Sequence, residues 1–367
     1  MVNGDRPVSR NPGDRPVLGI SIGDPAGIGP EIALKALARS EIYEKAVPVV
    51  YADRLVLEDA LEVTGKELAL HPVKGPGEAL GRSGTVDFIE AGIISRRGDY
   101  AYGKIGAKSG DAAFQYVVKA LKDAQVGAIN AVVTCPINKE AINLAGHHFA
   151  GHTEIFAHYT DTKNYGMLLS AKSGERNLNV IHVTTHVSLR RACDLITKDR
   201  VLDTIRLANL ALTLMGAKTR RIAVAGLNPH GSENGLFGDE EAVAIIPAIL
   251  AAKAEGLDAS GPYPPDTVFV KALGGAFDIV VAMYHDQGHI PLKLCGFTAK
   301  KVTVTSSEKV TVTFSGVNTT IGLPVIRTSV DHGTAFDIAG KNQSSEDSLL
   351  DAIDMAITFC VNRRHSC

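Results

Sequence analysis

Short apolar runs that end in polar or glycine-rich turns alternate along the chain with longer amphipathic segments. Several of the runs are apolar almost throughout, as strands buried on both faces of a parallel sheet tend to be. The runs that predict strands are 16–23, 48–53, 128–137, 178–186, 221–230, 278–286 and 323–330.

The amphipathic segments predict helices at 111–124, 197–216 and 238–256. Thr197 is a residue type that caps helix N-termini, and Gly216 is a common stop signal. This alternation of strands and helices predicts an α/β fold with a mostly parallel sheet, which binds ligands at the carboxyl ends of its strands. In 300–314, Val and Thr alternate on both sides of Ser-Ser-Glu-Lys, which predicts an appended antiparallel hairpin.

Composition is that of an ordinary globular protein. The chain has 367 residues, of which 45% are hydrophobic and 21% charged. A formal net charge of −2 gives no electrostatic reason to bind nucleic acid or an anionic membrane surface. Five cysteines without paired spacing favour a reducing compartment, and no apolar run resembles a signal peptide or a membrane span. We therefore expect a cytoplasmic protein with a loose tail at residues 1–15.

Two glycine-rich stretches fall short of nucleotide-binding fingerprints. Residues 23–37 lack the third glycine of the dinucleotide motif, and Ala107 stands where a phosphate loop needs glycine. A strand-to-helix turn with Pro30 near the first helical position accounts for the first stretch.

Three histidines, His186, His230 and His285, each follow an apolar run. Imidazole is the commonest nitrogen ligand of divalent metals, and three such ligands leave coordination positions open for substrate. Because the three occupy equivalent strand ends, the pattern favours a shared metal site. For each histidine alone, a hydrogen-bonded loop residue is the alternative, and His182 is a weaker fourth candidate.

Further polar residues are candidates for binding an anion. Arg327 lies inside an apolar run, where a charge is costly unless a carboxylate or phosphate balances it. His152 and Thr153 follow a glycine, and a helix cap is the alternative role for Thr153. Lys139 lies just beyond a strand end, where the alternative is a solvated surface lysine.

Taken in order, nine motifs resemble those of the 4-hydroxythreonine-4-phosphate dehydrogenase (PdxA) family. They are GDPAGIGPE (23–31), CPINK (135–139), GHTE (151–154), TTHVSLR (184–190), GLNPHGSENG (226–235), PDT (265–267), YHDQGHIPLK (284–293), GVNTTIGLPVIRTSVDHGTA (316–335) and DIAGK (337–341). That family is similar in turn to the isocitrate and isopropylmalate dehydrogenases. The resemblance implies two α/β/α domains with the active site in the interdomain cleft. We expect a coenzyme-side domain at 16–127 plus 300–367, and a substrate, metal and dimerisation domain at 128–299.

The resemblance also implies a set of ligands and contacts. It implies NAD or NADP held without the Rossmann fingerprint, one divalent metal per site, and a homodimer whose active sites lie at the subunit interface. The implied metal ligands are His186, His230 and His285. The implied substrate contacts are His152, Thr153, Lys293, Asn318 and Arg327, and the coenzyme contacts are His332, Gly333 and Asp337. Lys139 and Asp266 are the candidates for proton transfer. Three imidazoles favour zinc, cobalt or nickel, with manganese and magnesium as alternatives.

The implied reaction is an NAD-dependent oxidation and decarboxylation of a small 4-phosphorylated 3-hydroxy acid. The substrate is 4-phosphohydroxy-L-threonine, or 4-phospho-D-threonate or 4-phospho-D-erythronate. The insert at 300–314 and the wording DHGTAFDIAGK resemble the threonate and erythronate subgroup. Other PdxA-like enzymes oxidise unphosphorylated aromatic cis-dihydrodiol carboxylates, so a terephthalate dihydrodiol is the alternative substrate.

Overall fold

The structure, a computed structural model, describes residues 15–173, 176–304, 307–314 and 316–365. It divides into two compact units: unit 1 is Met1–Thr162 with Leu323–Arg364, and unit 2 is Lys163–Gly322 with the last three residues. The tail expected at 1–15 lies outside the described residues, apart from Arg15.

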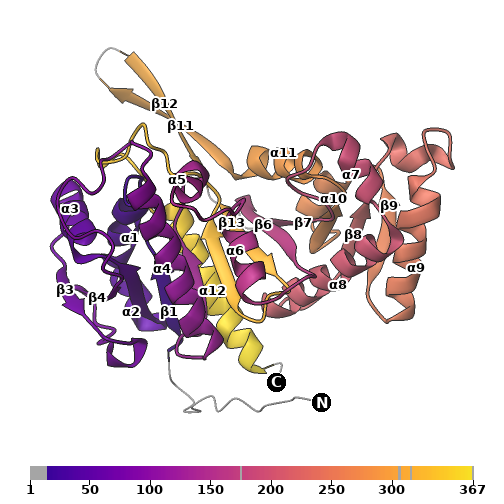
Figure 1. Ribbon diagram of the computed structural model, residues 1–367. Coiled ribbons are helices and arrows are strands. Elements are labelled where there is room, and N and C mark those ends of the chain that lie inside the picture. Colours follow the sequence, from indigo (N-terminus) through magenta and orange to yellow (C-terminus); the bar gives the residue numbers. More distant parts are fainter. Residues whose placement is uncertain (1–14, 174–175, 305–306, 315, 366–367) are drawn as a thin grey trace. The chain divides into compact units, whose positions relative to one another are not determined.

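Unit 1 is built on a parallel sheet with strand order β3-β4-β2-β1-β5-β14. The strands are β1 (Val17–Ser21), β2 (Val47–Ala52), β3 (Ala69–Pro72), β4 (Thr85–Glu90), β5 (Ala131–Thr134) and β14 (Ile326–Val330). The helices are α1 (Gly29–Leu37), α2 (Ser40–Lys45), α3 (Arg54–Thr64), α4 (Ala107–Gln125), α5 (Lys139–Leu144), α6 (His152–Tyr159) and α12 (Asp347–His365), with a short 3-10 turn η1 (Pro76–Glu78). The C-terminal helix α12, yellow in Figure 1, thus packs into the same unit as the N-terminal strands, with the Thr328 hydroxyl donating to the Ala352 carbonyl at 2.8 Å.

Unit 2 has a mixed sheet with strand order β13-β6-β7-β10-β8-β9, antiparallel at β13-β6-β7 and parallel beyond. The strands are β6 (Gly166–Ser173), β7 (Arg176–His182), β8 (Ile222–Ala225), β9 (Ala259–Tyr263), β10 (Ile279–Ala282) and β13 (Gly316–Ile321). The helices are α7 (Leu189–Leu195), α8 (Lys198–Leu214), α9 (Ile246–Ala254), α10 (Val268–Leu273) and α11 (His285–Gly296), with short turns η2 (Pro229–Glu233) and η3 (Glu241–Ile245). The predicted α/β class is confirmed in both units.

The appended hairpin is confirmed as well. β11 (Phe297–Val304) pairs antiparallel with β12 (Ser307–Phe314) in a separate two-stranded sheet, with Phe297 opposite Phe314 and Val304 opposite Ser307. The alternation of Val and Thr therefore marked two strands, of which the second, β12, already begins within the Ser-Ser-Glu-Lys stretch.

The turn between β1 and α1 requires glycine at position 23. Gly23 has φ +72°, and a Cβ built there would lie 2.1 Å from the carbonyl oxygen of Pro136. The Asp24 N–H donates to that same oxygen at 2.9 Å. A side chain at position 23 would therefore be strained and would also displace the segment that follows β5.

The division between the units differs from the predicted domain boundaries at 127/128 and 299/300. β5 pairs in parallel with β1, Ala131 opposite Leu18, which ties the chain after residue 127 to unit 1. β13 pairs with β6, Gly316 opposite Ala171, which ties the chain before residue 322 to unit 2. The roles assigned to the two domains stay predictions.

Three predicted strands, 178–186, 221–230 and 278–286, are too long, since β7 ends at His182 and β8 at Ala225. β10 ends at Ala282, the Met283 N–H donates to the side-chain oxygen of Gln287 at 2.7 Å, and α11 begins at His285. The polar residues from His285 onward therefore lie on a helix and not on the end of the strand.

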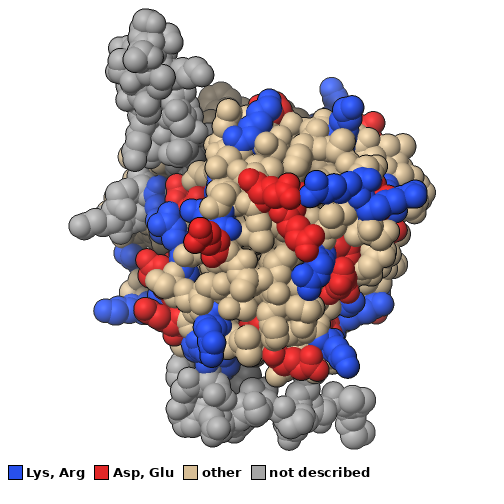
Figure 2. Space-filling view, turned by 90° about the vertical axis from the view of Figure 1, so that its left-hand side faces the viewer, with Lys and Arg blue, Asp and Glu red and all other residues tan. Residues whose placement is uncertain are grey.

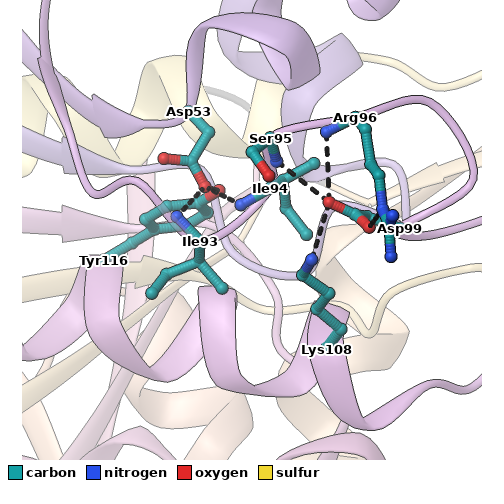
Figure 3. A network of polar contacts seen from close by, with 8 residues as sticks. All are labelled: Asp53, Ile93, Ile94, Ser95, Arg96, Asp99, Lys108 and Tyr116. Carbon is teal, nitrogen blue, oxygen red and sulfur yellow. Dashed lines mark hydrogen bonds and ion pairs between the residues drawn. The ribbon is translucent and has the colours of Figure 1, made fainter.

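A buried carboxylate, Asp53, fixes the loop that follows β4 (Figure 3). Its oxygens accept hydrogen bonds from the consecutive N–H groups of residues 91–94 at 2.5–3.1 Å, and from the hydroxyl of Tyr116 at 2.9 Å. Further along the same loop, Asp99 accepts from the N–H groups of Ser95 and Arg96 and pairs with Lys108 at 2.7 Å. Two carboxylates thus hold a loop that has no regular secondary structure.

We expect Asp53→Asn to lower the free energy of unfolding by about 3 kcal/mol, because the amide nitrogen would face buried N–H donors and leave them without an acceptor. Urea unfolding followed by circular dichroism measures this. Asp354→Asn is the control, since Asp354 forms an exposed ion pair with Lys45 and should cost less than about 1 kcal/mol. Equal losses in the two variants would contradict this role for Asp53.

Charges on the face of unit 1 shown in Figure 2 are mixed, with acidic and basic side chains interspersed. This mixture agrees with the small formal net charge of the whole chain, −2. Among the described helices, none has the length and apolar character needed to cross a membrane.

Candidate active-site residues

Arg327 is a buried cation of unit 1. It lies on β14, whose five residues are all buried, and is itself 3% exposed. Its guanidinium contacts the hydroxyl of Thr134 at 2.9 and 3.3 Å. Burial lowers the pKa of Arg327 to about 9, and the negative charge of Glu154 partly offsets that effect. A buried guanidinium is a strong site for an oxyanion.

His152 begins α6 and faces the same charge. Burial, followed by the positive charge of Arg327, holds the pKa of His152 well below its ordinary value, so the imidazole is neutral. The residue is half-buried, but its Nε2 atom is shielded from solvent and has no hydrogen-bond partner among the described residues. Thr153 follows it in the first turn of α6.

Lys139 and Glu154 approach the glycine that precedes His152. A Cβ built on Gly151 would lie 3.4 Å from Oε2 of Glu154 and 3.8 Å from Cε of Lys139. The structure therefore brings Lys139, His152, Glu154 and Arg327 into one cluster, which we call the unit 1 cluster. No role was predicted for Glu154 from the sequence, although its position two residues after His152 was a usable signal.

The three predicted metal ligands follow three neighbouring parallel strands of unit 2. His186 comes after β7, His285 after β10 and His230 after β8, and these strands are adjacent in the order β7-β10-β8. The carboxyl ends of neighbouring parallel strands lie at the same edge of the sheet, so the three histidines follow equivalent strand ends, as predicted from the sequence. The ring centroids of His186 and His285 lie 5.7 Å apart.

Two further histidines join this pair. The ring of His289 stacks on that of His285 with centroids 3.6 Å apart and an interplanar angle of 11°, and His182 lies 4.8 Å from His289. Burial, followed by the charge of the neighbouring imidazole, lowers the pKa of His182 to about 3 and that of His289 to about 4. Both are therefore neutral near pH 7.

Each of two predicted ligands is oriented by a carboxylate. Nδ1 of His285 contacts Oδ1 of Asp286 at 2.7 Å, and Nδ1 of His230 contacts Oε1 of Glu233 at 2.8 Å. A carboxylate on Nδ1 leaves Nε2 as the atom that binds a metal, which is the usual arrangement for histidine ligands. The donor set thus suits a divalent metal such as zinc.

His230 does not join the other two ligands within one chain. It lies on the turn η2, where its ring is 6.2 Å from that of Phe237. Across the described parts of the chain, no three His, Cys, Asp or Glu side chains form a group that could hold a metal ion.

The remaining predicted residues of unit 2 lie on different elements. Lys293 is on α11, two turns beyond His285, and Asp266 is exposed in the turn before α10. Asn318 lies on β13 opposite Leu169, and its Oδ1 is buried with no hydrogen-bond partner among the described residues.

The predicted coenzyme loop is anchored to α1 in unit 1. The loop after β14, which carries His332, Gly333 and Asp337, has no regular helix or strand until α12. The buried carboxylate of Glu31 accepts from the N–H groups of Gly340 at 2.6 Å and Asn342 at 3.1 Å. The sequence-distant motifs GDPAGIGPE and DIAGK are therefore in direct contact.

Asp24, in the turn before α1, is a second buried carboxyl of this motif. It is 0% exposed; one oxygen accepts from the Ala26 N–H at 2.9 Å, and the other has no hydrogen-bond partner among the described residues. Burial raises the pKa of Asp24 to about 6, although hydrogen bonds from Ala26 and Ser109 act in the opposite direction.

The raised pKa of Asp24 predicts a pH-dependent stability. The folded state favours the protonated carboxyl of Asp24. The contribution of this group to the free energy of unfolding is therefore fully present below about pH 4 and is lost as the pH rises through about 6. The difference from the ordinary value of 3.8 corresponds to about 3 kcal/mol. The free energy of unfolding of Asp24→Asn, measured with urea, should therefore exceed that of the wild type by up to about 3 kcal/mol at pH 8. Near pH 4 the two values should be equal. The same difference in free energy of unfolding at pH 4 and pH 8 would contradict a raised pKa of Asp24.

The chain was compared with known protein families and structures. The family model described as "Pyridoxal phosphate biosynthetic protein PdxA" matches residues 44–356. A 4-hydroxythreonine-4-phosphate dehydrogenase of Desulfosudis oleivorans is 47% identical over 355 residues, covering 95% of this chain and 98% of that protein. A D-threonate 4-phosphate dehydrogenase of Cupriavidus necator is 45% identical over 349 residues, covering 95% of this chain and 98% of that protein.

The crystal structure of 4-hydroxythreonine-4-phosphate dehydrogenase from Klebsiella pneumoniae is similar throughout. It matches with a TM-score of 0.80 and 41% identity, covering 94% of this chain and 99% of that one. Since these relatives are dehydrogenases, the chain is an oxidoreductase acting on a CH–OH group. The extent of the family match and the identity along almost the whole length show that this chain belongs to the PdxA family.

Proposed function

We propose that this protein is an NAD-dependent and metal-dependent dehydrogenase that oxidises and decarboxylates a 4-phosphorylated 3-hydroxy acid. The candidate substrates are 4-phospho-D-threonate, 4-phospho-D-erythronate and 4-phosphohydroxy-L-threonine. The observation that carries the proposal is the unit 1 cluster, in which the buried guanidinium of Arg327 lies beside a neutral His152. A phosphate dianion offers the planar, two-point contact that a guanidinium prefers.

The reaction removes two hydrogens before carbon dioxide leaves. The hydroxyl-bearing carbon gives up hydride to the nicotinamide while its O–H proton passes to a base, for which Lys139 and Asp266 are the candidates. The bond to the carboxylate carbon then breaks, carbon dioxide leaves, and a proton returns to the carbon that carried it. When bound, the metal polarises the reacting hydroxyl. In this scheme Arg327 binds the phosphate, and Lys293 and Asn318 are further predicted contacts.

The metal would be shared between two copies of the chain, with His186 and His285 from one and His230 from the other. Exposed apolar side chains support an assembly of this kind. Val243, Ile246 and Leu250 form a stripe along η3 and α9 and are 62%, 40% and 60% exposed. Such a stripe on a surface helix is typical of a protein interface.

NAD would be held by the anchored loop with His332, Gly333 and Asp337. The support is the contact of this loop with α1 through Glu31, which gives a loop without secondary structure a fixed position. That the reaction takes place between the two units, as in isocitrate and isopropylmalate dehydrogenases, stays a prediction, as does the choice between NAD and NADP.

A substrate panel tests the proposal. Purified protein with NAD and Zn²⁺ or Co²⁺ is assayed for NADH with the three phosphorylated acids, with unphosphorylated D-threonate and with a terephthalate dihydrodiol. We expect turnover of one or more phosphorylated acids, with release of carbon dioxide, and none of D-threonate. Turnover of the dihydrodiol alone would replace this proposal with the alternative predicted from the sequence.

A further inference from the structure

Three imidazoles of unit 2 form a column that runs from the core to the surface. His182, the last residue of β7, is 0% exposed; His289 on α11 is 9% exposed; and the side chain of His285 is 38% exposed. The ring centroids are 4.8 Å apart between the first two and 3.6 Å apart between the last two. The proposed metal ligand is thus the outermost ring of this column.

The middle ring is itself held in place. Nδ1 of His289 contacts the carbonyl oxygen of His285 at 2.9 Å. A carbonyl only accepts, so His289 carries its proton on Nδ1 and donates to the backbone one turn earlier. This bond adds to the packing that holds the ring against His285.

The rest of the segment 285–289 brings α11 close to the strands. Gln287 is buried, accepts from the Met283 N–H at 2.7 Å and donates to the Gly226 carbonyl at 2.8 Å. A Cβ built on Gly288 would lie 2.3 Å from Nε2 of His182, so only glycine permits this approach. The close approach in turn places His289 between His182 and His285.

The two neighbours of His285 constrain it in complementary ways. Asp286 contacts Nδ1 at 2.7 Å, which sets which nitrogen faces outward. The parallel face of His289, at an interplanar angle of 11°, restricts rotation of the ring out of that plane. An exposed side chain otherwise loses rotamer freedom when it binds a ligand, and preorganisation removes that cost.

We propose that His289 is a positioning residue that fixes the ring plane of His285 and thereby raises the affinity of the protein for its metal. The inference rests on the proposed function, because it takes His285 to be a metal ligand. Nothing in the reaction requires His289 to touch the substrate. Outer-sphere partners of metal-binding histidines typically contribute about 10-fold to 100-fold in affinity.

Two substitutions separate the stacked ring from the hydrogen bond. His289→Phe keeps a flat ring but loses the donor to the His285 carbonyl, whereas His289→Gln keeps a donor but has no ring. Co²⁺ is titrated into the metal-free full-length protein, and the affinity and the visible absorption bands are measured. We expect the wild type and His289→Phe to bind within about threefold of each other, and His289→Gln to bind about 10-fold more weakly with altered bands.

Controls distinguish failure of this inference from failure of the proposed function. His148→Leu removes an exposed histidine of unit 1 and should leave Co²⁺ binding unchanged. His285→Ala should abolish tight binding; if it does not, the proposed metal site is wrong. If His285→Ala loses Co²⁺ but His289→Gln binds as well as His289→Phe, or better, the positioning role is wrong and the metal site stands. Thermal unfolding of each metal-free variant shows whether the fold is retained.

Discussion

Replacing Arg327 with methionine is expected to lower kcat/KM for the phosphorylated substrate by about 1,000-fold, equivalent to about 4 kcal/mol. Methionine has a similar length and an apolar side chain, so it fits a strand in which all residues are buried. It removes the only group of the unit 1 cluster whose charge and geometry match a phosphate in two-point contact. Initial-rate kinetics over a range of substrate concentrations measures the effect.

Arg327→Lys sharpens the same test. Lysine keeps a positive charge but lacks the planar pair of nitrogens, so we expect an intermediate loss of about 10-fold to 100-fold. Arg206→Met is the control, because Arg206 forms an exposed ion pair with Glu255 and should change kcat/KM by less than about twofold. An Arg327→Met enzyme with wild-type KM would exclude Arg327 from the phosphate site.

The second large effect concerns His230 and His285 in mixed dimers. Alone, His230→Ala and His285→Ala should each lose nearly all activity, because each removes one metal ligand from every site. If a site combines His285 of one chain with His230 of the other, a dimer of one His230→Ala chain and one His285→Ala chain has one intact site. Random mixing then restores about one quarter of the wild-type activity.

The mixed-dimer experiment has a clear negative outcome. If the three ligands came from one chain, neither chain of the mixed dimer would carry a complete set, and co-expression would restore no activity. Differently tagged chains purified in tandem give the mixed dimer directly, in which half of the sites are intact. Metal content measured on that species gives a second readout that is independent of substrate identity.

Strands with a continuous apolar run were predictable from the sequence, whereas polar strands were not. β1, β2 and β5 are almost fully buried, and their residue types indicate this directly. β13, GVNTTI, is mostly buried as well, but half of its residues are polar, so no hydrophobic pattern marks it. β9, ASGPY, contains Gly and Pro, which normally argue against a strand.

Candidate site residues stood out in the sequence where the local residue type was unusual for its environment. A charge in an apolar run singled out Arg327, and histidines after three strands singled out His186, His230 and His285. His289 had no such signal, because its contact with His285 depends on a separation of four residues on a helix. The predicted strand ended at residue 286 and no helix was predicted after it, so nothing in the sequence indicated that these two side chains are neighbours.

Apart from the last three residues of the chain, unit 2 is a continuous stretch inserted into unit 1, and this organisation has a consequence for synthesis on the ribosome. β14 pairs with β5, so one edge of β5 stays without its neighbouring strand until the last part of the chain has emerged. All strands of the unit 2 sheet, by contrast, have been translated once the chain reaches residue 322. Unit 2 can therefore fold first, while β5 still has an unpaired edge. We expect nascent chains that are halted before β14 to depend most on chaperones.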